Sequence, residues 1–165
     1  MTLTTHAIVG AATAQFFPNH PYLAFFAGAA GHFLIDTIPH WDYPLVSLIK
    51  HEDKMNYDMA MDKRFVVDLF KIGLDIFLGI GLVLLIFIHP HRIFQVTTLA
   101  GTLGGIFPDG LQFLYFKIRR EPLTSIQRFH VWIQKNSELK VAHHVGIALQ
   151  IALIIPVVLL VKYLF

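Results

Sequence analysis

The sequence predicts an all-α protein, a polytopic membrane helical bundle with four to five spans and short interfacial helices. Three observations lead to this prediction. Of the 165 residues, 55% are hydrophobic and only 15% are charged, whereas soluble domains average about 25% charged residues. Apolar stretches of helical length recur along the chain. Most charged residues gather in the polar segments between those stretches, where a membrane chain would meet water.

Composition also limits the domain organisation and the kinds of site. Residues 1–165 suit one membrane-embedded helical domain. The chain contains no cysteine, which excludes disulfides, thiolate metal sites and cysteine nucleophiles. Its net charge of +2 is too small to indicate a nucleic-acid partner. We therefore expect membrane lipid, and no nucleic acid, among the partners.

Helix boundaries follow from capping residues, prolines and the polar turns between apolar runs. Five principal helices are expected, at residues 6–17, 22–38, 64–88, 93–118 and 145–164. The first is short, because a membrane span needs about 20 residues, so the expected number of spans is four or five. Short interfacial helices are expected at residues 45–49 and 126–135, and Trp132 would anchor the second of them in the headgroup region.

The end of the second expected helix carries four potential metal ligands within eleven residues: His32, Asp36, His40 and Asp42. His32 and Asp36 are one helical turn apart and share a face. Pro39 disfavours helical geometry at the residue before it, which places His40 and Asp42 on the following loop. Imidazole and carboxylate groups bind divalent metals where cysteine is absent. The alternative is a polar helix end at the water interface.

A weak internal repeat links this segment to the fourth expected helix. The two copies are Ala27-Gly28-x-x-Gly31-x-x-x-x-Asp36 and, 73 residues later, Ala100-Gly101-x-x-Gly104-x-x-x-x-Asp109. A repeat would place Asp36 and Asp109 at equivalent depths, and the glycines would let the two helices approach closely. The alternative is a chance match in a sequence rich in glycine and alanine.

The third expected helix holds Asp68, Lys71 and Asp75 on one face, because they are spaced by three and four residues. Ionisable groups in a membrane helix are costly and usually face the bundle interior. Lys71 can neutralise one carboxylate, so Asp75, the deeper one, is the candidate for a catalytic role. His6 and His130 are either interfacial residues or site residues.

The distribution of basic residues predicts the orientation of the chain. Ten of the thirteen lysines and arginines fall between the second and third or between the fourth and fifth expected helices, or, as Arg64 and Lys117 do, at the adjoining helix ends. That side should be cytoplasmic, in the plasma (inner) membrane, with the N-terminus inside. The histidines and aspartates from five separate segments then share one membrane level, and this convergence is the main functional indication in the sequence.

Three short motifs support a family resemblance that covers most of the chain. They are Thr5-His6-Ala7-Ile8-Val9-Gly10-Ala11-Ala12, His32-x-x-x-Asp36-x-x-Pro39-His40-Trp41-Asp42 and Gly104-Gly105-Ile106-Phe107-Pro108-Asp109. The chain resembles bacterial membrane-bound metal-dependent hydrolases of the YdjM type and is more distantly similar to zinc-dependent phospholipase C. The resemblance implies that His6, His32, Asp36 and Asp109 bind metal. The His-Arg-x-x-Thr-His stretch usual in that family is absent, and its nearest counterpart is Arg128-Phe129-His130.

Together these indications predict a membrane-bound metal-dependent hydrolase that acts on a lipid or lipid-linked phosphoester or ester at the cytoplasmic face. The expected metal ligands are His6, His32, His40, Asp36 and Asp109, and the expected catalytic residues are Asp42, Asp75 and His130. The expected cofactor is a divalent metal, zinc first, with manganese or magnesium as alternatives. The other possibilities are a transporter whose intramembrane aspartates and histidines carry protons or metal ions, and a structural membrane protein.

Overall fold

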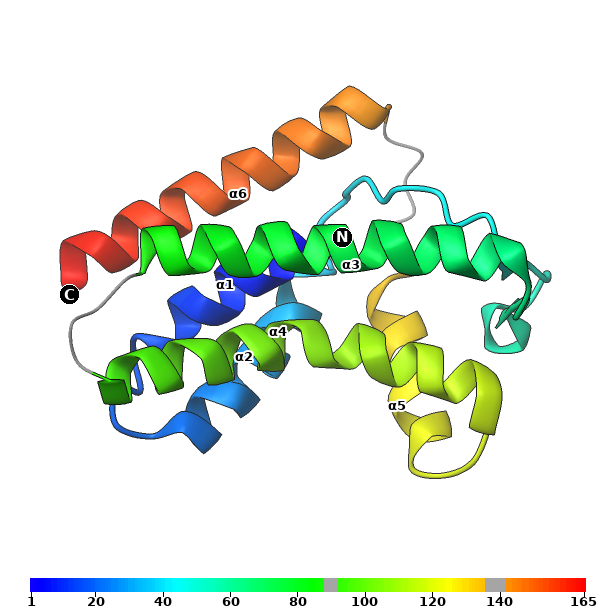
Figure 1. The fold of residues 1–165 in the computed structure, drawn as a ribbon, viewed down its shortest axis with the longest axis horizontal. Coiled ribbons are helices and arrows are strands. Elements are labelled where there is room, and N and C mark those ends of the chain that lie inside the picture. Colours follow the sequence, from blue (N-terminus) through cyan, green and yellow to red (C-terminus); the bar gives the residue numbers. More distant parts are fainter. Residues whose placement is uncertain (88–91, 136–141) are drawn as a thin grey trace.

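The computed structural model describes residues 1–87, 92–135 and 142–165 (Figure 1). Its α-helices are α1 (Leu3–Ala14), α2 (Pro21–Ile35), α3 (Lys63–Ile86), α4 (Arg92–Ile118), α5 (Leu123–Ile133) and α6 (His143–Leu164). A short 3-10 helix, η1 (Lys54–Asn56), lies between two antiparallel strands, β1 (Leu48–Ile49) and β2 (Asp58–Met59). The predicted all-α class is confirmed. Residue 88, the expected end of the third helix, lies outside the described residues.

Helix α1 forms the centre of the fold and contacts α2, α3, α4 and α6. Nearly all of its residues are buried, and small side chains such as Ala7 and Ala11 let the neighbouring helices approach it. With only 12 residues it is too short to cross a bilayer, which requires about 20. This helix is therefore the core about which the others pack.

Helices α1, α2 and α4 approach one another at glycines. A Cβ atom on Gly28 would collide with the carbonyl oxygen of Gly101, and a Cβ atom on Gly104 with that of Phe25. The expected close approach of α2 and α4 is therefore confirmed at Gly28 and Gly104, whereas the missing side chain of Gly101 faces α1. The same prediction is wrong for Gly31. A Cβ atom added there would meet only side chains, at ordinary distances of 3.5 and 3.7 Å.

Further close contacts join α4 to α1, the helix between α4 and α3. An added Cβ on Gly101 would collide with the carbonyl oxygen of Gly10, and one on Gly105 with that of His6. These contacts set the separation of the helices that carry the polar centre described below.

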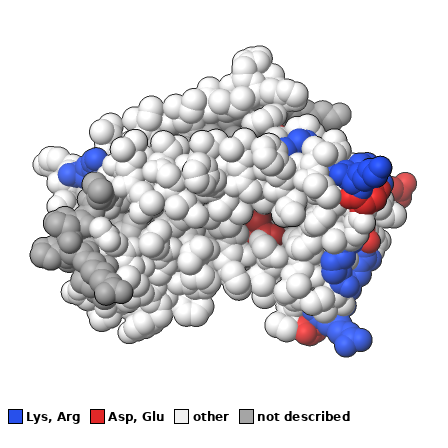
Figure 2. Space-filling model, viewed as in Figure 1, with Lys and Arg blue, Asp and Glu red and all other residues white. Residues whose placement is uncertain are grey.

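Helices α3 and α6 are long and apolar enough to cross a membrane, by length and composition. The outward side of α3 carries large exposed apolar residues, among them Phe70, Phe77 and Leu85. Figure 2 shows a broad uncharged face, with most of the visible charged side chains at one end of the molecule. Among the described residues only these two helices qualify as spans, so the expected bundle of four to five spans is not confirmed.

The segment before α3 is tied to that helix by Asp68. Its carboxylate accepts hydrogen bonds from Val46 N at 3.0 Å, Ser47 N at 2.7 Å and Ser47 Oγ at 2.6 Å. The predicted ion pair is confirmed, with Lys71 Nζ 3.5 Å from Asp68 Oδ1.

The prediction of a short helix at residues 45–49 is wrong, because residues 46–47 form a bend and residues 48–49 pair with β2. The helix expected at 126–135 is present as α5, shifted by a few residues towards the N-terminus.

Candidate metal centre

Five ionisable side chains from separate parts of the chain converge at one buried point. They are His6 from α1, His32 from α2, Asp36 just after α2, Asp109 from α4 and His130 from α5. The histidines and Asp36 are buried, whereas 27% of the surface of the Asp109 side chain is exposed. The centre is therefore enclosed but reachable beside one carboxylate.

The donor atoms lie at separations that suit a shared metal ion. Asp36 Oδ1 lies 3.2 Å from His6 Nε2, and Asp36 Oδ2 lies 3.5 Å from His32 Nε2 and 3.1 Å from His130 Nε2. The Asp109 carboxylate lies 3.8 to 4.0 Å from the same three nitrogens. Ligand atoms bound to one ion at 2.0–2.2 Å stand about 3 to 4 Å apart. The donor atoms form two overlapping groups, His6/His32/Asp109 and His32/Asp36/His130, and each group has the dimensions of a coordination shell.

Unpartnered polar atoms point to the same conclusion. His6 Nε2 and Asp36 Oδ1 are buried and 3.2 Å apart, but neither forms a hydrogen bond within the described residues. A buried polar atom without a partner costs about 1–3 kcal/mol. A cation between these two atoms would satisfy both, so the residues present fit a divalent metal.

Neighbouring groups orient the histidine and carboxylate side chains. His32 Nδ1 donates to the carbonyl oxygen of Gly105 at 2.7 Å, which leaves Nε2 with a lone pair directed at the centre. The rings of His6 and His32 stack at a centroid distance of 3.8 Å. Gln134 Nε2 donates to Asp36 Oδ2 at 2.8 Å. These contacts hold the donor atoms in place before any ion is bound.

Local structure explains how the sequence places two of these groups together. Helix α2 ends at Ile35, and Asp36 is its C-cap with helical backbone angles, so the turn that begins at His32 remains regular. The predicted shared face of His32 and Asp36 is confirmed by the 3.5 Å separation of their donor atoms. The repeat also leads to the correct helix pair, because Asp36 and Asp109 both reach the centre.

His40 and Asp42 lie beside this centre, outside the groups of donor atoms found among the described residues. His40 Nε2 is 3.6 Å from Asp42 Oδ2, and Asp42 accepts a hydrogen bond from the Met1 amino group at 3.0 Å. The Met1 amino group is also 3.6 Å from Asp36 Oδ1. Burial by itself would lower the pKa of that amino group, but Asp42, Asp36 and Asp109 raise it above its ordinary value. The structure therefore links Asp42 to the centre through the Met1 amino group, and His40 only through Asp42.

Asp75 forms hydrogen bonds with the first turn of α1. Its carboxylate accepts hydrogen bonds from Leu3 N at 2.7 Å, Thr4 N at 3.1 Å and Thr4 Oγ1 at 2.6 Å. Free amide groups at a helix N-terminus favour a negative charge at this position. The structure thus brings Asp75 to the end of the central helix, and it does not bring it into the cluster of five.

Replacement of Asp75 should therefore affect stability more than metal binding. Asp75→Ala removes three hydrogen bonds to α1 and should lower the free energy of unfolding by about 1–3 kcal/mol. Metal content, measured by elemental analysis of folded protein, should stay at the wild-type ratio. Asp62→Ala, which removes the exposed cap of α3, is the matched control and should cost less. Loss of metal with unchanged stability would contradict this expectation and would indicate that Asp75 belongs to the metal site.

Two residues that support the site, Gln134 and Gly105, are not among those predicted from the sequence. Gln134 stands four residues after His130, the same spacing that links His32 to Asp36, and this regularity is the signal that could have identified it. Gly105 contributes only its carbonyl oxygen, and no side-chain pattern reveals such a role.

No family model, curated protein or solved structure matches this chain. The resemblance to membrane-bound metal-dependent hydrolases therefore stays a prediction based on the motifs.

Proposed function

We propose that this protein is a metal-dependent hydrolase that acts on a lipid or lipid-linked phosphoester or ester at the cytoplasmic face of the plasma membrane. The observation that carries the proposal is the convergence of three histidines and two carboxylates in one centre, where two of the donor atoms form no hydrogen bond within the described residues. Two carboxylates would balance the charge of a divalent ion, and neutral histidines would complete its shell. Zinc is the proposed metal, with manganese or magnesium as alternatives.

In this proposal some residues bind the metal ion and others transfer protons during hydrolysis. His6, His32 and Asp36 are buried and would hold the ion. A bound divalent metal lowers the pKa of its water ligand and polarises a phosphoryl or acyl oxygen. Asp109 is the partly exposed member, and its Oδ1 would accept a proton from the attacking water. His130, whose Nε2 lies 3.9 Å from Asp109 Oδ1, would complete the shell or take that proton from Asp109 and donate it to the leaving group.

The surroundings of the centre favour a lipid substrate. Helices α3 and α6 present large apolar surfaces, as expected of segments in contact with acyl chains. Figure 2 shows acidic atoms at the surface in the middle of the otherwise uncharged face. A lipid ester could approach such a carboxylate without leaving the membrane. We propose an N-terminus on the cytoplasmic side, as the basic residues predict.

Turnover by the purified protein tests this proposal. The full chain in detergent would be loaded with zinc, manganese or magnesium and assayed with phosphodiester and phospholipid ester substrates. We expect metal-dependent turnover that falls at least about a hundredfold in His32→Ala, because the bound ion activates the water. The matched control is His20→Ala, since His20 precedes α2 at its other end and should be dispensable.

A transport function would give a different result in the same preparations. Buried histidines and aspartates between helices also suit the passage of protons or metal ions. Ion flux into liposomes without turnover of any ester would favour that function and contradict the hydrolase.

A further inference from the structure

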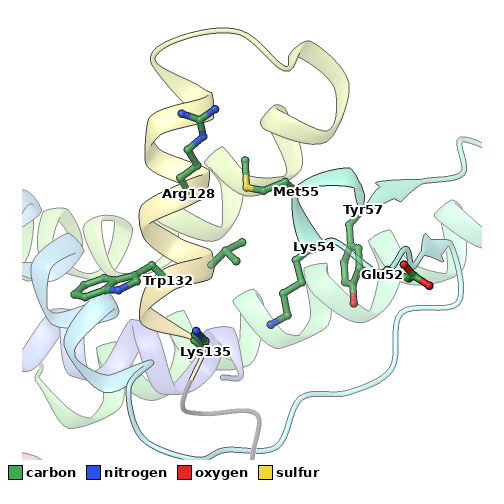
Figure 3. Close-up of a pocket in the computed structure, with 8 residues that line it drawn as sticks. Glu52, Lys54, Met55, Tyr57, Arg128, Trp132 and Lys135 are labelled. Atoms are coloured by element: carbon green, nitrogen blue, oxygen red, sulfur yellow. The ribbon is translucent and has the colours of Figure 1, made fainter.

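A second feature, separate from the metal centre, is a pocket of about 490 Å³ between α5 and the segment that carries η1 (Figure 3). Eight residues line it: Glu52, Lys54, Met55, Tyr57, Arg128, Val131, Trp132 and Lys135. Ligand pockets commonly measure about 300–1,000 Å³. This one is therefore large enough for a small polar headgroup.

Helix α5 separates the pocket from the metal centre. Gln127 and His130 are buried on its inner side, and Gln134 follows His130 by one turn. The pocket residue Arg128 lies on a different side of the same helix, and Lys135 follows just after the helix ends. The pocket is therefore a distinct site that shares one wall with the centre.

The opposite wall is held in place by bonds to its main chain. Tyr115 on α4 donates its hydroxyl to the carbonyl oxygen of Met55 at 2.9 Å. Arg119 donates to the carbonyl oxygen of Tyr57 at 3.2 Å. These bonds fix the turn that presents Lys54, and Lys54 lines the pocket across from α5.

The charge in the pocket is predominantly positive. Lys54, Arg128 and Lys135 contribute three cations, against the single carboxylate of Glu52. Figure 3 places Glu52 beyond Tyr57, away from Arg128 and Lys135. Arginine and lysine together are the usual partners of phosphate groups. The pocket therefore has the composition of a phosphate site.

We propose that this pocket binds the phosphate of an anionic phospholipid headgroup. Trp132 borders it with 68% of its area exposed, and an exposed tryptophan beside basic residues is typical of the membrane interface. In Figures 1 and 2 the pocket elements, α5 and η1, lie at the charged end of the molecule, beside the uncharged face. The proposal requires no metal and goes beyond the hydrolase function.

Binding of short-chain lipids provides the test. The full chain in detergent would be titrated with dihexanoyl phosphatidylglycerol, dihexanoyl phosphatidylcholine and inorganic phosphate, with tryptophan fluorescence as the readout. We expect a saturable change with phosphatidylglycerol that is lost in Trp132→Phe, and much weaker binding of phosphatidylcholine. The double variant Arg128→Gln/Lys135→Gln should bind phosphatidylglycerol at least about tenfold more weakly.

A matched control separates this site from general charge effects. Lys50→Gln/Lys63→Gln removes the same charge outside the pocket and should bind as the wild type does. Unchanged metal content and thermal unfolding in the pocket variant would show that its fold and the metal centre are intact. Equal weakening in both double variants, or no saturable signal, would overturn the proposal. Inorganic phosphate binding as tightly as the lipid would also overturn it, in favour of a soluble phosphate compound.

Discussion

Removal of metal by a chelator is expected to lower the thermal unfolding temperature of the wild-type protein and to leave the Asp36→Asn/Asp109→Asn variant unaffected. Asp36 and Asp109 approach the same three histidine nitrogens, and a bound divalent cation stabilises two carboxylates placed together in one site. An ion present at 100 times its dissociation constant stabilises the folded state by about 2.7 kcal/mol. For a domain of this size the shift is about 5–10 °C.

The control for this experiment lies next to the centre. His40→Ala/Asp42→Asn removes two residues that were expected in the site but reach it only through the Met1 amino group. This variant should keep the chelator response of the wild type. A wild-type protein without stoichiometric metal at neutral pH, and without a chelator effect, would contradict the metal centre.

Gly105→Ala is expected to be among the most damaging single substitutions in the chain. An added Cβ would collide with the main-chain carbonyl oxygen of His6, and a main-chain contact cannot be relieved by a change of rotamer. Overpacking of this kind costs about 1–3 kcal/mol, and occasionally more. Gly105 also orients His32 through its own carbonyl oxygen, so metal affinity should fall together with stability.

The same helix offers a matched control. Gly110 is the next glycine of α4, and an added Cβ there meets nothing within 4 Å. Gly110→Ala should therefore be neutral or should stabilise α4 by up to about 1 kcal/mol, because alanine favours a helix. Thermal unfolding and metal content of both variants would be measured in one detergent. Similar behaviour of the two variants would show that α1 and α4 are not held as closely as described.

Local sequence patterns were sufficient to predict the helical class and three of the five residues of the candidate metal centre. The four-residue spacing of His32 and Asp36 is a property of one helix, so it holds wherever that helix packs. The Ala-Gly-x-x-Gly pattern likewise predicts close helix contact without reference to a partner, and the repeat led to Asp109. The Asp68–Lys71 pair followed from helical spacing as well.

Only the tertiary structure decided which polar residues meet. Asp75 has the same residue type and depth as a site carboxylate, but α1 begins beside it and uses its oxygens. His130 reaches the centre because α5 packs against α4, and no pattern in either segment encodes that contact. The first helix similarly looks like a short membrane segment, yet it is enclosed by four other helices. Spacing along one helix determines a face, whereas contacts between distant segments depend on how the whole chain buries its apolar surface.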